Sequence, residues 1–190
     1  MATRLPFPSD DPEPTNTVFR VASPADMLCK FGWEIRQLTT SLRSPSQNPY
    51  EPRLIAYRAF NCAVTGWHIA HWTWSYSDHA LRAQMAARYG FSLVRQNRRN
   101  LERFCQAVAI ECPELYLCRR IANGKDVIVD TTDTCVSAHL KRPAWESACY
   151  ELTFDDGNGS RGAEVFHPAY SYWRGVLAEF GFLQMSQVSE

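Results

Sequence analysis

"WHIAHWTWSYSDH", residues 67–79, holds three of the chain's five histidines and three of its six tryptophans. It continues an apolar-periodic segment that predicts a long helix over about residues 53–74. On a helical wheel of about 100° per residue, one stripe carries Phe60, Val64, Trp67, His71 and Trp74. Because Cys62 and Ile69 lie on the opposite face, we expect this helix at the centre of a helical bundle.

The stripe predicts different surroundings for the two neighbouring histidines. His71 falls in the middle of the apolar face, so we expect it to be buried between helices together with Trp67. His68 falls at the edge, where a cleft could reach it. Two histidines at i and i+3 could also bind a metal ion, with Glu34 of the first helix as a further ligand. No other cluster has convincing ligand spacing, so no metal site is expected.

Start and stop signals outline the helices around this segment. Ser23 and Pro24 begin a helix that should run to about Thr40. Asp78 can cap a third helix, which Gly90 stops. Further helices are expected over about residues 94–110, from Pro113 to Gly124, and from Pro168 onward.

Between residues 127 and 166 the hydrophobic pattern alternates, as in strands. The expected strands are "DVIVD" (126–130), "TCVSAHLK" (134–141), "SACYELTF" (147–154) and "GAEVF" (162–166), with a turn at "DDGNGS" (155–160). The sequence therefore predicts a mainly α protein: a helical bundle with a small β-hairpin element inserted before the C-terminal helix. Residues 1–22 are expected to be a flexible arm, and residues 23–190 a single helical domain.

Charge and cysteine usage narrow the class of protein. Residues 21–126 carry a net charge of +6 and residues 127–190 a net charge of −5, although the whole chain is neutral. This polarity can create an electropositive face, or can draw the two parts together. The seven cysteines lack paired spacing, which favours free thiols and a cytoplasmic location. No apolar run is long enough for a membrane span, so no membrane association is expected.

Two basic segments are candidate binding sites. In the fourth expected helix the arginines lie opposite the apolar side chains, at Arg95, Arg98, Arg99 and Arg103. They could contact a nucleic acid or the chain's own acidic C-terminal part, or simply face solvent. In "CRRIANGKD" (118–126), the donors Arg119, Arg120, Asn123 and Lys125 could hold a phosphate or a 2′-hydroxyl. Alternatively, these cations stabilise a helix C-terminus that Gly124 caps.

"FNCAVTGWHIAHW" (60–72) and "CPELYLCRRIANGKD" (112–126) resemble a group of small uncharacterised bacterial helical proteins. The layout also resembles the HEPN domains, helical bundles found in many prokaryotic RNase toxins and defence proteins. That family carries an Arg followed four to six positions later by a His. Arg119 or Arg120 matches the Arg, whereas Gly124, Lys125 and Asp126 occupy the positions of the His.

The resemblance implies a HEPN-like domain that binds RNA or a nucleotide, as a degenerate RNase or a component of a defence module. A metal-independent endoribonuclease would use Arg119 to stabilise phosphate charge and His68, from another helix, to move the proton. No cofactor is expected. One alternative is a non-catalytic subunit that binds a protein partner or a second copy of itself. Another is a metal enzyme built on the histidines.

Overall fold

The computed structural model describes residues 21–43, 50–123, 137–141, 149–155 and 160–183. Its helices are α1 (Pro24–Arg43), α2 (Glu51–Tyr76), α3 (His79–Arg88), α4 (Asn97–Glu111), α5 (Pro113–Ala122) and α6 (Phe166–Glu179). Its strands are β1 (Ser137–Lys141), β2 (Glu151–Asp155) and β3 (Ser160–Gly162), and a 3₁₀ turn, η2 (Ala163–Val165), precedes α6. The predicted mainly α bundle with a small β element before the last helix is confirmed.

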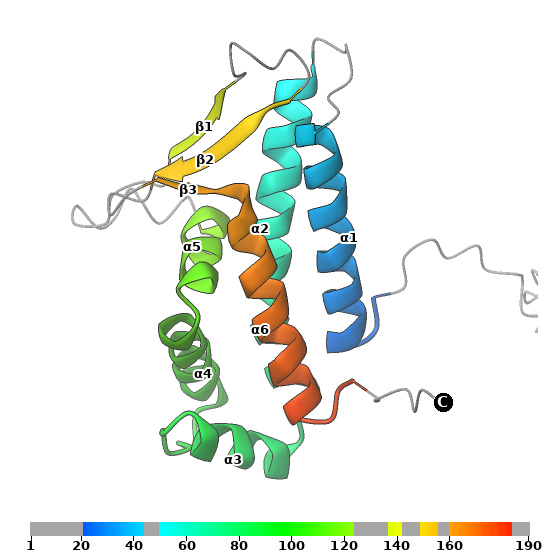
Figure 1. Cartoon of the computed structure of the whole chain (residues 1–190). Helices are drawn as coiled ribbons and strands as arrows, with labels where there is room; N and C mark the ends of the chain where they lie inside the picture. The colour runs from blue at the N-terminus through cyan, green and yellow to red at the C-terminus, as the bar shows by residue number, and fades with distance from the viewer. Residues whose placement is uncertain (1–20, 44–49, 124–136, 142–148, 156–159, 184–190) are drawn as a thin grey trace, which may run out of the picture.

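The helices form an up-and-down bundle (Figure 1). Helices α1 and α2 run in opposite directions, α4 and α5 together return along a third leg, and α6 forms the fourth (Figure 1). The sheet lies at the end where α1 stops and α2 starts, whereas α3 lies at the opposite end (Figure 1). Helix α2 packs against α1, α4, α5 and α6, so its predicted central position is confirmed.

Side-chain caps fix where two helices begin, as the sequence predicts. Ser23 Oγ accepts a hydrogen bond from the Asp26 backbone N–H at 3.1 Å, and Asp78 Oδ1 accepts one from Leu81 N–H at 2.8 Å. Each bond satisfies a donor that the first helical turn leaves without an intrahelical partner. Gly90 follows α3 with a φ of +71°, a conformation that favours glycine and ends the helix.

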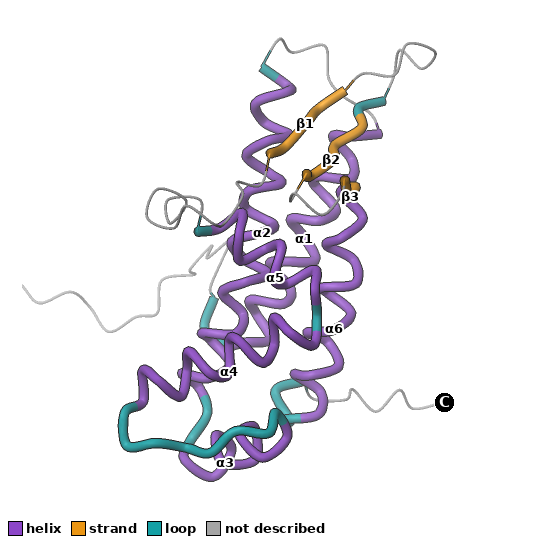
Figure 2. Tube along the Cα trace, turned by 90° about the vertical axis from the view of Figure 1, so that its left-hand side faces the viewer, coloured by secondary structure: helices purple, strands orange, loops and turns teal. Residues whose placement is uncertain are grey.

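The third leg is bent between α4 and α5. Cys112 ends α4 and begins α5, with a φ of −125°. Pro113 cannot continue a helix from α4, because it lacks a backbone N–H and its ring clashes with the preceding turn. It fits the first turn of α5 instead. The leg therefore consists of two short helices, each with its own direction (Figure 2).

Three helices meet at Gly66 of α2. A Cβ atom there would lie 2.8 Å from Cζ of Phe31, and the Gly66 carbonyl accepts a 2.8 Å hydrogen bond from the Trp173 indole. Phe31 also packs edge-on against Phe166 of α6, with ring centroids 6.4 Å apart. The missing side chain of Gly66 thus lets α1 and α6 approach α2 closely.

The buried face of α2 differs from the predicted stripe. Phe60 is 47% exposed, whereas Cys62 and Ile69, placed on the opposite face, are fully buried. The core-facing side chains are mostly small: Ala59, Cys62, Ala63, Gly66 and Ala70. Close helix packing selects these small residues, and a wheel centred on the largest aromatic side chains consequently misplaces the core. Trp67 and Trp74 are buried as predicted.

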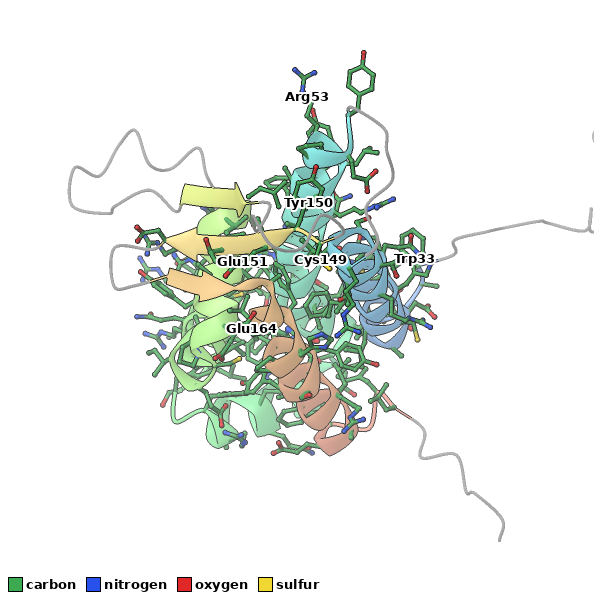
Figure 3. The ribbon with its side chains drawn as sticks, turned by 45° about the horizontal axis from the view of Figure 1, so that its top comes forward. Trp33, Arg53, Cys149, Tyr150, Glu151 and Glu164 are labelled. Carbon is green, nitrogen blue, oxygen red and sulfur yellow. The ribbon has the colours of Figure 1, made fainter. Side chains whose placement is uncertain are left out.

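The strands form an antiparallel sheet in the order β1-β2-β3. Leu152 and Phe154 are buried and Tyr150 is half-buried, which confirms their predicted common face. The Tyr150 N–H donates to the Leu42 carbonyl at 2.8 Å, so the sheet is fastened to the end of α1. Figure 3 shows Cys149 and Tyr150 at this junction between the sheet and the helices.

The returning strand is shorter than predicted. Residues 162–166 were expected to be extended, but β3 ends at Gly162 and the chain enters η2. Val165 and Phe166 are both buried, which a strand does not allow on one face because successive side chains alternate. The predicted strand at 126–130, most of the 155–160 turn and residues 1–20 of the predicted arm lie outside the described residues.

A polar network joins α3, α4 and α6. Arg88 Nη2 lies 2.7 Å from Glu111 Oε1, and its Nε lies 3.2 Å from Glu179 Oε1. The Tyr172 hydroxyl donates to Glu111 Oε2 at 2.9 Å and lies 2.9 Å from the Tyr89 hydroxyl. Because its members come from three helices, the network fixes this end of the bundle.

Candidate functional site

A cleft of about 590 Å³ opens between α2, α4 and α5. Helices α4 and α5 face the viewer in Figure 2. The cleft is lined by Trp67, His68, His71, Arg98, Leu101, Glu102, Cys105, Gln106, Arg119 and Asn123. Arg119 and His68, the two residues predicted to act together, therefore share one cavity although 51 positions separate them in the sequence.

Trp67 forms the wall on which Arg119 rests. The indole is 5% exposed, and Arg119 Cζ lies 5.6 Å from its ring centroid. A cation over an aromatic face is held by the ring quadrupole. The buried ring therefore restricts the guanidinium to the cleft and leaves its N–H donors available to an anion.

His68 and His71 lie side by side on the cleft, with ring centroids 5.6 Å apart. Both are exposed, so the prediction that His71 is buried between helices is wrong. The helix is rotated so that small residues face the core, and both imidazoles turn outward beside Trp67. Partial burial lowers the pKa of His68 below its ordinary value, and the charge of Lys30 lowers it further. Partial burial and His68 lower the pKa of His71.

Lys30 links α1 to α2. Its ammonium group donates to Glu34 Oε1, and to Thr65 Oγ1 at 2.5 Å. Glu34 is 5% exposed; among the described residues its Oε2 has no hydrogen-bond partner. In the part of the chain that the structure describes, no three His, Cys, Asp or Glu side chains lie close enough to hold a metal ion. The proposed set of His68, His71 and Glu34 is therefore not assembled.

The arginines predicted on α4 have different surroundings. Arg98 lines the cleft and forms an ion pair with Glu102 at 3.1 Å, in which both side chains are well exposed. Arg103 donates to the Ser92 carbonyl at 2.8 Å, so it supports the loop before α4. Arg95 and Arg99 are exposed and are not among the cleft residues.

The second basic segment is also divided. Arg119 and Asn123 share the cleft, as their i, i+4 spacing predicts. Arg120 is half-buried and lies over the Tyr116 ring, 5.9 Å from its centroid. It is not among the cleft residues. Lys125 and the predicted cap Gly124 lie outside the described residues.

The thiol in the cleft is poorly suited to nucleophilic attack. Cys105 is 6% exposed, and burial raises its pKa to about 12 even though Arg119 acts in the opposite direction. The thiol therefore stays protonated at neutral pH, and the thiolate is the nucleophilic form. The six described cysteines are unpaired: Cys29, Cys62, Cys105, Cys112, Cys118 and Cys149.

Two aromatic residues that were not predicted from the sequence as site residues lie beside the cleft. Trp72 and Tyr76 stack with centroids 5.5 Å apart and an interplanar angle of 20°. With His71 and Ser75 they line a shallow pocket of about 230 Å³. Their i, i+4 spacing was a usable signal, because it places both rings on one face of the helix.

The chain matches no protein-family model, and neither the curated proteins nor the solved structures compared with it give a match. Within the described residues, no helix combines the length and the apolar character that crossing a membrane requires.

Proposed function

We propose that the cleft binds phosphate groups of RNA or of a nucleotide. The observation that carries this proposal is the presence of Arg98 from α4 and Arg119 from α5 on one cavity. Guanidinium groups match the geometry of phosphate oxygens. Asn123 and Gln106 add neutral donors at the same wall. Glu102 offsets part of the charge, so an incoming phosphate competes with it for Arg98.

The same cleft has the groups for metal-independent RNA cleavage. The lowered pKa of His68 favours a neutral imidazole at neutral pH, which can accept the proton of a 2′-hydroxyl. That oxygen would attack the adjacent phosphorus, displace the 5′-oxygen and leave a cyclic phosphate, while water protonates the leaving oxygen. Arg119 would offset the charge that accumulates on the phosphate. The proposal includes this cleavage chemistry. It also includes a HEPN-like role in defence and a cytoplasmic location.

Binding can be measured with a short fluorescein-labelled single-stranded RNA by fluorescence anisotropy. Arg119→Gln and Arg98→Gln should each weaken binding about tenfold and reduce the slope of affinity against salt by about one. Arg36→Gln is the matched control, because it removes an exposed arginine of α1 outside the cleft. Absence of RNA binding at low ionic strength, or an equal loss in the control, would contradict the proposal.

Cleavage requires a separate assay. The wild-type protein, with chelator present, should convert RNA to products ending in a cyclic phosphate. His68→Ala and Arg119→Ala should abolish the activity while the circular dichroism spectrum is preserved. His71→Ala tests whether the neighbouring imidazole contributes, since both rings line the cleft. An inactive wild type would remove the nuclease part of the proposal and leave the binding part.

A protein-interaction role is the second candidate. The first half of α2 exposes large apolar side chains at helical spacing: Leu54 is 37%, Tyr57 65% and Phe60 47% exposed. Exposed apolar stripes often contact partner proteins. If a second copy covers this stripe, Tyr57→Ser and Phe60→Ser should convert a dimer to a monomer in light scattering. A monomeric wild type would exclude dimerisation through this stripe.

A further inference from the structure

The shallow pocket next to the cleft has the features of a nucleobase site. It is lined by His71, Trp72, Ser75 and Tyr76, and His71 also lines the arginine-containing cleft. All four residues belong to α2 and lie on its outer side. The two cavities are therefore neighbours along one helix, with His71 between them.

The aromatic pair presents part of its apolar surface to solvent, although Trp72 also packs against the core. Tyr76 is 51% exposed and Trp72 is half-buried, yet their rings are stacked. Arg82 Nη2 donates a hydrogen bond to the Ser75 backbone carbonyl at 3.4 Å. This contact places a cation near the pocket. Flat exposed rings close to positive charge are the features with which proteins bind single-stranded nucleic acids.

We propose that the His71–Trp72–Ser75–Tyr76 pocket takes a nucleobase by stacking while Arg98 and Arg119 hold a phosphate of the same strand. His71 lines both the pocket and the cleft that holds the two arginines, so one short segment of strand can reach both cavities. The inference rests on the proposed phosphate-binding cleft and names its ligand as single-stranded RNA. Bases within a duplex are paired and stacked on each other, so they cannot enter the pocket.

The test compares three labelled RNAs at low salt: a single-stranded hexamer, its abasic counterpart with the same phosphates, and a duplex. The base-bearing strand should bind about tenfold more tightly than the abasic strand. Tyr76→Leu and Trp72→Leu should bring the two affinities together without changing abasic binding. Tyr57→Leu is the matched control, because it removes a 65% exposed tyrosine elsewhere on α2.

The outcomes separate the two proposals. Equal binding of the abasic and base-bearing strands, or of the duplex and the single strand, would overturn the base site and leave the phosphate cleft intact. Absence of binding by every RNA would overturn both. Trp72 is half-buried, so its substitution can disturb folding. The more exposed Tyr76→Leu variant then decides, and Tyr76→Phe should keep the wild-type preference for bases.

Discussion

The guanidinium of Arg119 lies over the indole of Trp67, 5.6 Å from the ring centroid. The indole belongs to α2 and is buried in the core of the bundle, whereas the cation belongs to α5 and lines the cleft. The packing of the bundle and the position of a candidate phosphate ligand therefore depend on one contact. A change at Trp67 should affect both stability and binding.

Trp67→Ala should lower the free energy of unfolding by about 3–5 kcal/mol, because it leaves a cavity in the core. Urea denaturation measures this loss, and the variant should also bind RNA more weakly, since Arg119 loses its support. Trp33→Ala is a suitable comparison, because that indole is 43% exposed and its removal should cost much less. Similar urea midpoints for the wild type and Trp67→Ala would contradict the tight packing of this indole.

Gly66→Ala should destabilise the protein by about 1–3 kcal/mol. The new methyl group would lie 2.8 Å from Cζ of Phe31, so this fully buried ring or the helix that carries it must shift. Gly175→Ala is the matched control on α6, where a Cβ atom would have no neighbour within 4 Å among the described atoms. It should stabilise the protein by about 0.5–1 kcal/mol through helix propensity. Calorimetric melting of both variants should therefore give shifts of opposite sign.

Stability should fall as the pH decreases below about 6.5. The folded protein lowers the pKa of His68 and His71 from 6.5, so the unfolded chain binds more protons in acid. The stabilising contribution is present above pH 6.5 and is lost as the pH falls through the folded pKa values. Urea midpoints at pH 7.5, 6.5 and 5.5 should show a smaller decline in the double variant His68→Gln and His71→Gln.

His167→Gln, which removes an exposed histidine of α6, is the control for that series. A double variant with the same pH dependence as the wild type would show that the cleft histidines do not contribute. RNA affinity should change in the opposite direction. A phosphate in the cleft favours the protonated imidazoles, so binding should tighten as the pH falls, provided that the protein remains folded.

Tyr172→Phe should cost about 1–2 kcal/mol. The hydroxyl donates to Glu111 and lies within hydrogen-bonding distance of Tyr89, so its removal takes one hydrogen-bond partner from each of these side chains. Tyr57→Phe removes a hydroxyl from a 65% exposed ring and should be nearly neutral. A cost for Tyr172→Phe below about 0.5 kcal/mol, the ordinary range for surface positions, would argue against this network.

Local signals predicted the helices well, because their causes are local. Ser23, Asp78 and Gly90 act on the nearest turn of backbone, and their effects are visible in the sequence. The buried face of α2 depends instead on what packs against it. Gly66 and its small neighbours accept Phe31 and Trp173, residues that lie far away in the chain. A wheel of α2 considered in isolation cannot contain that information.

The candidate site could be predicted only in part, because some of its residues are placed by local helix spacing and others by the packing of the whole bundle. Arg119 and Asn123 are one turn apart on a helix, and their common face follows from spacing. His68 was assigned to an edge and does line the cleft, but His71 was assigned to the core and also lines it. The face of α2 that is buried in the structure differs from the predicted one, and both imidazoles therefore lie outside the core. The aromatic pair Trp72 and Tyr76 was missed because exposure depends on the whole bundle.

The bend at Cys112 sets the relative placement of two cleft arginines. It separates the helix that carries Arg98 from the helix that carries Arg119, so the span between these two charges is a property of the joint angle. Substitutions at the joint could widen or narrow that span and leave both arginines in place. If the cleft binds phosphate as proposed, the size of the anion that fits and the strength with which it is held are separable traits, and a lineage could adjust one without giving up the other.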